Sequence, residues 1–281
     1  MEKKSFTNLF HKYYIISILV VLIIGITATY LTYKQTAKET KEKLLTNVSI
    51  IANTLNSEEI KSLTGTTADI SNSNYQSIKS KFERIIKLND DHRFIYLWTY
   101  KNEKVVFLID SENPISTEYS PPGQIYEEAT ELDKEVLLGL SPRSIEFSQD
   151  RWGNWLTALV PILDQNGKVV AVLGIDMNSK VYWNTIYVSL AIPIISTIFI
   201  LLIIIIGFIL RKKENEYIAL KEKLLSVARH ELRAPLTGLS WLTETMLNNK
   251  IKPEEKNQNL ETVHNKIKEL IENVNKVIEE K

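Results

Sequence analysis

The stretch IYVSLAIPIISTIFILLIIIIGFIL, residues 186–210, runs for 25 residues without a charge. A helix rises 1.5 Å per residue, so about 20 apolar residues cross the roughly 30 Å hydrocarbon core of a bilayer. Pro193 is tolerable in such a helix, because local adjustments satisfy the carbonyl that it frees. Tyr182, Trp183 and Tyr187 lie at the edge of the run, as is typical of a membrane interface. We therefore predict a transmembrane helix over 186–210.

A second apolar run, YYIISILVVLIIGITATYLTY, covers residues 13–33 and is also uncharged. Its 21 residues are long enough for a transmembrane helix. A cleaved signal peptide is the alternative interpretation. The run exceeds the usual apolar region of a signal peptide, and no A-x-A site follows it, so a second transmembrane helix is favoured.

The distribution of basic residues does not by itself decide which ends of the two predicted spans face the cytoplasm. Basic residues flank both spans on the side of the termini, but Lys34, Lys38, Lys41 and Lys43 lie on the other side of the first span. Long loops cross the membrane largely regardless of charge, so this excess is permitted. Two spans put both termini on one side. We predict a two-pass protein of the plasma membrane with both termini in the cytoplasm, mainly from the character of the C-terminal segment.

The overall composition excludes several classes of function. Acidic and basic residues balance at 34 each, which gives no reason to expect nucleic-acid binding. The chain has no cysteine, so disulfides, thiolate catalysis and cysteine-ligated metals are excluded. No His, Asp and Glu cluster has metal-binding spacing, and we predict no metal site. His92, beside Asp90 and Asp91, fits a solvated loop.

Residues 34–180, between the two spans, are enough for one domain. Helical patterns come first, and runs rich in β-branched and aromatic residues follow, with the turn sequences KNEK and DQNG between them. This order predicts an α+β domain with an antiparallel sheet. The predicted helices cover 34–55, 75–88 and 126–140, and the predicted strands cover 94–100, 105–110, 155–162 and 168–177.

This segment resembles the extracytoplasmic Cache sensor domains of bacterial receptors, which are PDC-type and PAS-like. The matching pieces are the long first helix, YLW and FLIDS in the first strand pair, PPG, WGNWL, and VPILDQNGKVVAVLGIDM at residues 160–177. The closing stretch is the most specific part. The resemblance implies an extracellular small-molecule ligand bound against one face of the sheet.

Aromatic residues and one acid are the candidate ligand contacts in this domain. The alternative interpretation is that the aromatic side chains form the core, because aromatics dominate cores. Asp176 ends a strongly apolar strand, where it could cap a turn or meet a cationic group of a ligand. The candidate residues are Tyr96, Trp98, Tyr126, Trp152, Trp155 and Asp176.

The segment after the second span, residues 225–281, has an apolar heptad pattern. Leu225, Ala228, Leu232, Pro235 and Leu239 alternate in spacings of 3 and 4, which predicts one apolar seam of a helical bundle. His230 falls opposite that seam and is expected in solvent. Proline lacks an N–H and clashes with the carbonyl four residues earlier, so we expect a bend beside the histidine.

A second helix is predicted after the break NNKIKP. Its apolar positions run from Leu260 through His264, Ile267 and Ile271, and this register makes His264 structural. Two amphipathic helices joined by a short loop form an antiparallel hairpin. One hairpin cannot bury both of its seams, so two hairpins are expected to pair into a dimeric four-helix bundle. Residues 211–224 form a helical linker whose spacings of 3, 4, 4 and 4 from Tyr217 resemble a stutter.

The stretch LLSVARHELRAPLTGL, residues 224–239, resembles the H-box of the HisKA class of sensor histidine kinases. The resemblance implies that His230 is the phosphoacceptor, that Glu231 is its general base, and that a response-regulator aspartate then takes the phosphoryl group. Arg229 and Arg233 could contact the phosphate or the regulator. Position 234 usually carries a threonine or asparagine that supports dephosphorylation, and Ala234 puts phosphatase activity in doubt.

No glycine-rich nucleotide-binding motif occurs among the nine glycines. We therefore expect no cofactor in this chain, with ATP and Mg²⁺ supplied through an ATP-binding kinase domain that acts in trans on a truncated sensor. The resulting architecture is a multi-domain membrane protein: residues 1–12 as cytoplasmic N-terminus, a sensor between two spans, and a phosphoacceptor hairpin. The alternative is a non-catalytic receptor or dimerisation module that modulates full-length kinases.

Overall fold

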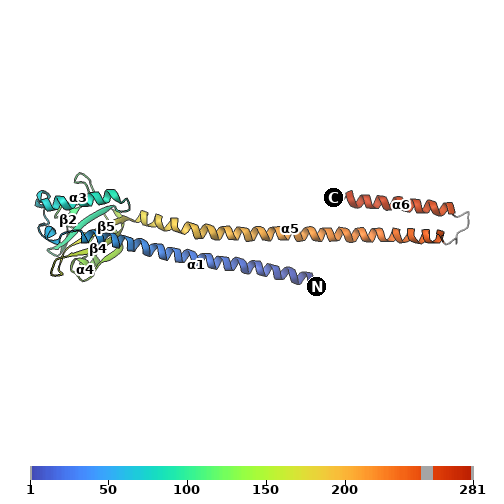
Figure 1. The fold of residues 1–281 in the computed structure, drawn as a ribbon, viewed down its shortest axis with the longest axis horizontal. Helices are drawn as coiled ribbons and strands as arrows, with labels where there is room; N and C mark the ends of the chain where they lie inside the picture. Colours follow the sequence, from blue (N-terminus) through green and yellow to red (C-terminus); the bar gives the residue numbers. More distant parts are fainter. Residues whose placement is uncertain (1, 248–255, 280–281) are drawn as a thin grey trace. The chain divides into compact units, whose positions relative to one another are not determined.

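The structure is a computed structural model that describes residues 2–247 and 256–279 (Figure 1). Backbone contacts divide the chain into two units, one of residues 19–199 and the other of residues 1–18 together with 200–281. The division falls inside the two longest described helices, α1 (Glu2–Asn53) and α5 (Ser179–Leu247). The first unit therefore holds the whole sheet, and the second holds the segment with His230.

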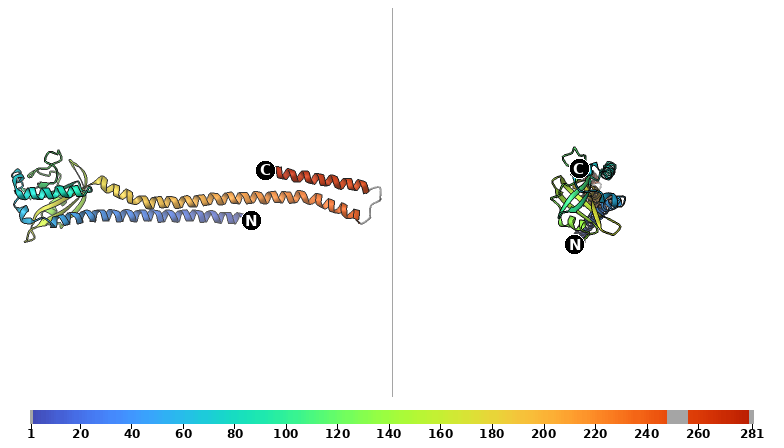
Figure 2. Two further views of the ribbon diagram at one scale, coloured as in Figure 1. Left: turned by 45° about the horizontal axis from the view of Figure 1, so that its top comes forward. Right: turned by 90° about the vertical axis from the view of Figure 1, so that its left-hand side faces the viewer.

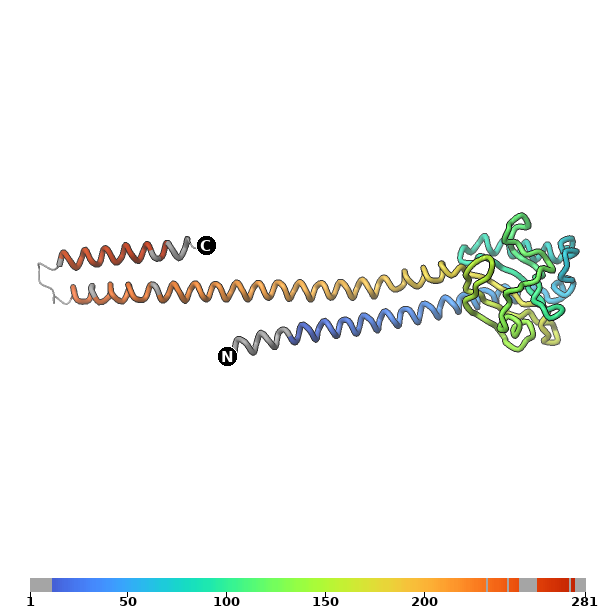
Figure 3. The backbone as a smooth tube through the Cα atoms, turned by 180° about the vertical axis from the view of Figure 1, so that it is seen from behind, coloured from blue at the N-terminus to red at the C-terminus, as the bar shows by residue number. Residues whose placement is uncertain are grey.

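α1 and α5 carry the two apolar runs. Within the described residues, both are long and apolar enough to cross a membrane. In the unit of residues 19–199 they approach closely at Gly25, where an added Cβ would collide with the side chain of Thr197. Both helices extend from the same side of the sheet in this unit, as the backbone tube shows (Figure 3).

Five antiparallel strands form one sheet in the order β2-β1-β5-β4-β3. The two predicted hairpins are confirmed, and their turns have the left-handed backbone that the sequences KNEK and DQNG favour, at Asn102, Glu103 and Gly167. β3 is an edge strand that the sequence analysis did not predict. The strands are β1 (Phe94–Lys101), β2 (Lys104–Asp110), β3 (Ser144–Asp150), β4 (Gly153–Leu163) and β5 (Val169–Asn178).

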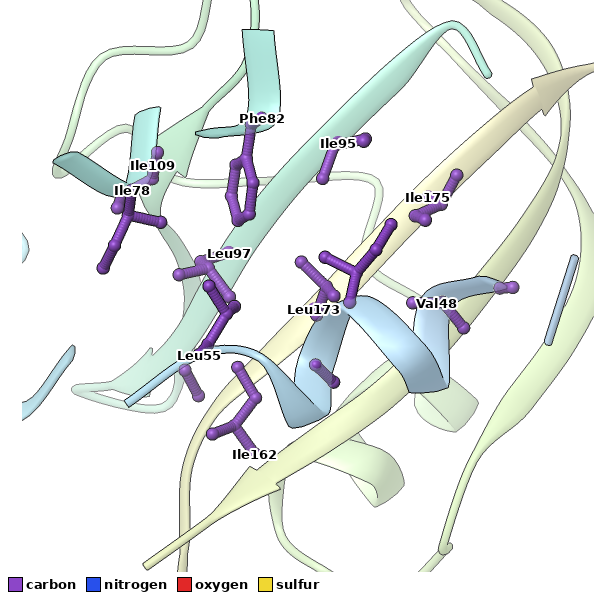
Figure 4. Packing of buried hydrophobic residues seen from close by; sticks show 14 of the residues in the cluster. Val48, Leu55, Ile78, Phe82, Ile95, Leu97, Ile109, Ile162, Leu173 and Ile175 are labelled. Atoms are coloured by element: carbon purple, nitrogen blue, oxygen red, sulfur yellow. The ribbon is translucent and has the colours of Figure 1, made fainter. Parts of the chain in front are cut away.

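One face of the sheet packs against helices. Successive strand residues point to opposite faces, so Ile95 and Leu97 of β1 turn to this side and meet Leu173 and Ile175 of β5. The C-terminal part of α1 and the helix α3 (Ser73–Leu88) cover them, as the close view shows (Figure 4). The short helix α2 (Ser57–Lys61) and the 3₁₀ helix η1 (Thr67–Ser71) join α1 to α3.

The opposite face of the sheet carries a second, aromatic cluster. Phe94, Tyr96 and Trp98 alternate with the residues of the first cluster along β1 and are all buried. The helix α4 (Glu131–Leu137), which begins in a capping box at Thr130, lies over this face with the loop that follows β2. The second view in Figure 2 shows the sheet together with the segments that cover it.

The second unit consists of helices. α6 (Lys256–Glu279) runs alongside the C-terminal part of α5 in the opposite direction in both side views (Figures 1 and 2). The half-buried residues of α5 include four of the predicted seam, Ala228, Leu232, Pro235 and Leu239, whereas Leu225 is exposed. α5 stays helical through Pro235.

Candidate functional sites

His230 lies in α5 on the side opposite the seam, and its side chain is exposed, as the heptad pattern predicted. The neighbouring seam residues Ala228 and Leu232 are half-buried. The helix geometry explains the difference, because residues two positions apart point to different sides of a helix. The imidazole is therefore accessible to a macromolecule that approaches α5 from outside the hairpin.

Two arginines flank His230 on the surface of α5. Arg229 and Arg233 lie one turn apart and are both exposed. With Leu232, Leu236, Thr237 and Ser240 they line a shallow, open hollow along one side of the helix. The side chain of Glu231, the predicted general base, lies outside the described residues, and its role stays a prediction.

His264, predicted to lie in the seam of the second helix, is exposed in the single chain. Val263, Lys266 and Leu270 are half-buried instead, together with Val274, which continues the predicted spacing. The predicted seam residues Leu260, Ile267 and Ile271 remain 50%, 44% and 55% exposed. Both sets repeat every three to four residues, so the spacing alone could not say which set faces α5 within one chain.

A pocket opens on the aromatic face of the sheet in the first unit. It is narrow and partly open, with a cavity volume of about 20 Å³ between its lining side chains. Five of the six predicted ligand contacts line it: Tyr96, Trp98, Tyr126, Trp152 and Asp176. Sequence reasoning missed the other lining residues, which are Phe94, Phe107, Asp110, Glu118, Ser120 and Asp150.

Trp155 is the predicted contact that does not line the pocket. Its side chain is buried behind the lining, where its ring packs edge-on against Phe94 with centroids 5.1 Å apart. Its indole Nε1 donates to Asp150 Oδ1 at 2.9 Å. Trp155 therefore supports a pocket carboxylate from behind, because its position on β4 points it at the β3–β4 turn.

Asp176 is buried on the pocket face of β5, with only 4% of its surface exposed. Thr157 Oγ1 and Tyr96 Oη donate to its Oδ1, at 2.6 and 3.1 Å. Burial raises the pKa of its carboxyl group to about 7, and Asp150 and Asp133 raise it further while the two hydroxyl donors oppose the shift. Asp176 is thus held by side chains and does not cap a turn.

Gly174 makes the contact between Tyr96 and Asp176 possible. It lies directly opposite Tyr96 in the β1–β5 pairing. An added Cβ at this position would collide with the Tyr96 ring. The ring therefore lies across β5 and reaches the carboxylate two residues further along the strand.

Two further carboxylates line the pocket with partners of their own. Asp110, at the end of β2, accepts from the backbone N–H groups of Glu112 and Ser120 at 3.0 and 2.7 Å. Burial raises its pKa to about 6, and those N–H donors oppose the shift. Asp150 accepts from the backbone N–H of Trp152 at 2.9 Å in addition to the indole of Trp155.

His92 is buried, contrary to the expectation of a solvated loop. Its Nε2 lies 3.3 Å from Asn47 Nδ2 and 3.2 Å from Asn89 Nδ2. Burial lowers the pKa of the imidazole below its usual value. The charge of Asp91 opposes this shift, and the charge of Lys43 adds to it. Packing against α1 removes this side chain from water. Among the described residues, no group of three or more His, Cys, Asp or Glu side chains could hold a metal ion.

The solved structures that this chain resembles at low similarity include a ligand-binding domain and a sensor domain. One is the ligand-binding domain of the Campylobacter jejuni chemoreceptor Tlp3 in complex with 4-methylisoleucine, with a TM-score of 0.43 and 13% identity over 60% of this chain and 62% of that one. Another is the sensor domain of the V. cholerae histidine kinase DctB, with a TM-score of 0.44 and 12% identity over 60% and 59% of the two chains. This chain therefore spans less than two thirds of the length of either structure. No curated protein matches it.

The C-terminal segment matches a family model. The model is described as the His Kinase A (phospho-acceptor) domain, and it matches residues 220–280. The match includes the exposed His230, both flanking arginines and all of the described α6. Residues 220–280 of this chain therefore belong to the His Kinase A phospho-acceptor domain family.

Proposed function

We propose that this chain is a membrane sensor of the two-component histidine kinase family, in which His230 accepts a phosphoryl group and passes it to an aspartate of a response regulator. The exposure of His230 within the matched residues 220–280 carries the proposal. A phosphoacceptor must meet two large partners in turn, a kinase domain and a regulator. An imidazole on the outer side of the hairpin is accessible to both.

The chemistry requires a neutral imidazole. One ring nitrogen of His230 attacks the γ-phosphorus of ATP, the N–P bond forms, and the bond to the bridging oxygen breaks to release ADP. Glu231 takes the proton that the ring loses. In the second step a carboxylate oxygen of the regulator attacks phosphorus, the N–P bond breaks, and the imidazole regains a proton.

Arg229 and Arg233 supply positive charge beside the acceptor. A guanidinium presents several N–H donors in a planar fork that suits phosphate and carboxylate oxygens. The hollow that the two arginines line also contains Leu232 and Leu236, so it combines charge with apolar surface. We assign this surface to docking of the regulator's acidic site.

ATP and Mg²⁺ are proposed to be held by a catalytic domain outside these residues. The nine glycines contain no G-x-G spacing, and the described residues offer no group for a metal ion. A homodimer is proposed to form around the α6 residues Leu260, Ile267 and Ile271. An apolar stripe of this kind gains stability when a second copy covers it.

We propose that ligand binding in the pocket starts the signal and that β5 transmits the resulting conformational change. Asp176 lies in the pocket, and α5 begins at Ser179, three residues later. A ligand that moves Asp176 therefore acts on the start of the helix that contains His230. α1 and α5 each have the length and composition of a membrane span, which supports both termini on one side. We place that side in the cytoplasm and the sheet unit outside the cell, because residues 220–280 match a phospho-acceptor domain.

A phosphorylation assay tests the proposal. The full chain in detergent is incubated with labelled ATP, Mg²⁺ and the catalytic domain of a related kinase. We expect acid-labile label on the native chain and none on His230→Gln. His264→Gln is the matched control, because His264 is also exposed and lies within residues 220–280.

Two results would contradict the proposal. Label that persists in His230→Gln would place the acceptor elsewhere. Absence of label with every catalytic domain tried, while the chain stays folded and dimeric, would favour a non-catalytic module that only modulates other kinases.

A further inference from the structure

An exposed phenylalanine lies in the otherwise polar edge strand β3. Phe147 is 45% exposed, and the strand, SIEFSQD, has only one other apolar residue, Ile145. Side chains alternate between the two faces of a strand, so Phe147 shares the face of Ile145, which packs against the helix-covered core. One exposed ring has no meaning by itself, but this ring belongs to a larger surface.

Phe147 is the first of three rings in a stacked row. Its ring plane is within 8° of that of Trp183, with centroids 6.1 Å apart, and Trp183 lies 6.3 Å from Tyr187 at 28°. The buried Tyr182 meets the edge of Phe147 at 5.0 Å and fixes the row to α5. Trp183 and Tyr187 are 39% and 66% exposed. An edge strand and a helix thus build one open aromatic surface together.

Two lysines lie at the end of this row that is farther from the apolar run of α5. Lys180 is exposed and shares a helix face with Trp183 and Tyr187, because the spacings are 3 and 4. The ammonium nitrogen of Lys41, in α1, lies 5.4 Å from the centroid of the Phe147 ring. The surface therefore changes along its length from aromatic rings beside the apolar run to positive charge.

The rise of α5 gives the level of this surface in the proposed membrane topology. Trp183 lies three residues before Ile186, the first residue of the apolar run, which is about 4.5 Å along the helix. The headgroup layer on each side of a bilayer is about 5–7 Å thick, so Trp183 is at its level. Lys180 lies about 9 Å from Ile186, and its long stem lets the ammonium group reach back to the lipid phosphates.

We propose that the surface formed by Phe147, Trp183, Tyr187, Lys41 and Lys180 binds anionic phospholipid of the leaflet next to the sheet unit and holds the edge of the sheet on the membrane. Tryptophan and tyrosine rings are enriched at the headgroup level, and ammonium groups attract lipid phosphate. A second copy of the chain fits less well, because a symmetric contact would bring like-charged lysines together. The inference rests on the proposed membrane placement and on no part of the phosphotransfer.

Lipid selectivity tests the role of the two lysines. The full chain is reconstituted in phosphatidylcholine bilayers that contain a trace of spin-labelled phosphatidylglycerol or spin-labelled phosphatidylcholine. Electron paramagnetic resonance separates lipid that the protein holds from free lipid. At low salt we expect the native chain to hold phosphatidylglycerol about threefold or more tightly than phosphatidylcholine. The double variant Lys41→Gln/Lys180→Gln is expected to lose about half of that preference or more.

A matched double variant controls for the loss of charge. Lys104→Gln/Lys168→Gln removes two exposed lysines from the turns at the other end of β1 and β5, away from the start of α5. It is expected to select lipid like the native chain. The basic residues 211–213 are the same in all three proteins, so the differences between them report on the proposed surface.

A nitroxide label tests the depth of the aromatic row. The native chain has no cysteine, so Phe147→Cys and Leu163→Cys each provide one labelled position. The two native side chains have similar exposures, 45% and 50%, but Leu163 lies at the end of β4 that is away from α5. We expect the ratio of collisions with oxygen to collisions with a water-soluble nickel complex to be about threefold or more higher at 147 than at 163.

The proposal is overturned if the native chain holds both lipids equally, if Lys41→Gln/Lys180→Gln keeps the full preference, or if the collision ratios at 147 and 163 are equal. Dipolar broadening between labels at 147 would assign the surface to a second copy. A chain that holds no lipid would reject the proposed membrane placement itself, whereas held lipid without selectivity rejects only this inference. Melting followed by circular dichroism verifies that every variant is folded.

Discussion

Asp176 shows how a carboxyl group buried beside a pocket can lower the stability of a domain. Burial raises the pKa of its carboxyl group to about 7, so the folded state binds a proton at pH values where the unfolded chain, with its pKa near 4, does not. The stability that comes from this proton is fully present below about pH 4 and is lost as the pH rises through about 7. Above that pH the folded state holds a buried charge.

The variant Asp176→Asn is expected to raise the melting temperature of the sheet domain at about pH 8 by roughly 5 °C and to change it little at about pH 4. The amide oxygen can still accept from Thr157 and Tyr96, and no charge is buried. Circular dichroism of the full chain in detergent measures the difference, with Asp90→Asn as the control. A lower melting temperature at the higher pH would show that the charge itself stabilises the fold.

Single residues also show where sequence reasoning stops. Alternation along β1 places Tyr96 and Trp98 on one face, and both were predicted as ligand contacts. Phe94 has the same parity and could have been found by the same rule. Asp150 and Asp110 could not, because they reach the pocket through a turn and through cross-strand register, which local spacing does not contain. His92 was misjudged for a related reason, since Asn47 of α1 covers it.

The elements followed the sequence most closely where a strong periodic pattern met a clear turn. β1, β2, β4 and β5 alternate or run apolar between turn residues, and all four were predicted. β3 reads SIEFSQD, with only two apolar residues, and it pairs at the sheet edge with one face half-exposed. A strand of this kind is stabilised by its neighbour β4 rather than by its own pattern, so propensity alone does not reveal it.

The helical linker of α5 permits a test of dimer packing at the level of one element. Tyr217, Leu220 and Leu224 are 67%, 57% and 43% exposed in a single chain. They lie on one side of the helix, where a second copy would cover them. The chain has no cysteine, so each single cysteine substitution from 217 to 228 reports on one position.

We expect oxidative crosslinking to be strongest at 217, 220 and 224 and weak at Lys223, which belongs to the outer side of the helix. Crosslinked dimers are measured by gel electrophoresis of native membranes. Equal crosslinking at every position would contradict the proposed packed dimer. Crosslinking centred on Lys223 would place the dimer interface on another side of the helix.

At the scale of the whole molecule, the segment that forms the sheet domain lies between two long apolar helices in the sequence. In the residues that the structure describes, the candidate spans start at Lys12 and at Ser179, and the sheet lies between them in the chain. Hydrocarbon cannot hold the polar loops of such a domain, so the proposed two-pass topology requires the whole domain to lie on one side of the bilayer. The same topology requires the segment with His230 to lie on the other side.

Cysteine labelling in intact cells tests this arrangement. Ile115, in the loop after β2, is 92% exposed, and Glu261 of α6 is also exposed. A membrane-impermeant maleimide is expected to label Ile115→Cys in intact cells and Glu261→Cys only after the membrane is permeabilised. The cysteine-free native chain is the blank. Labelling of both positions in intact cells would mean that one helix does not span the membrane, and the reverse pattern would put the pocket in the cytoplasm and exclude an extracellular ligand.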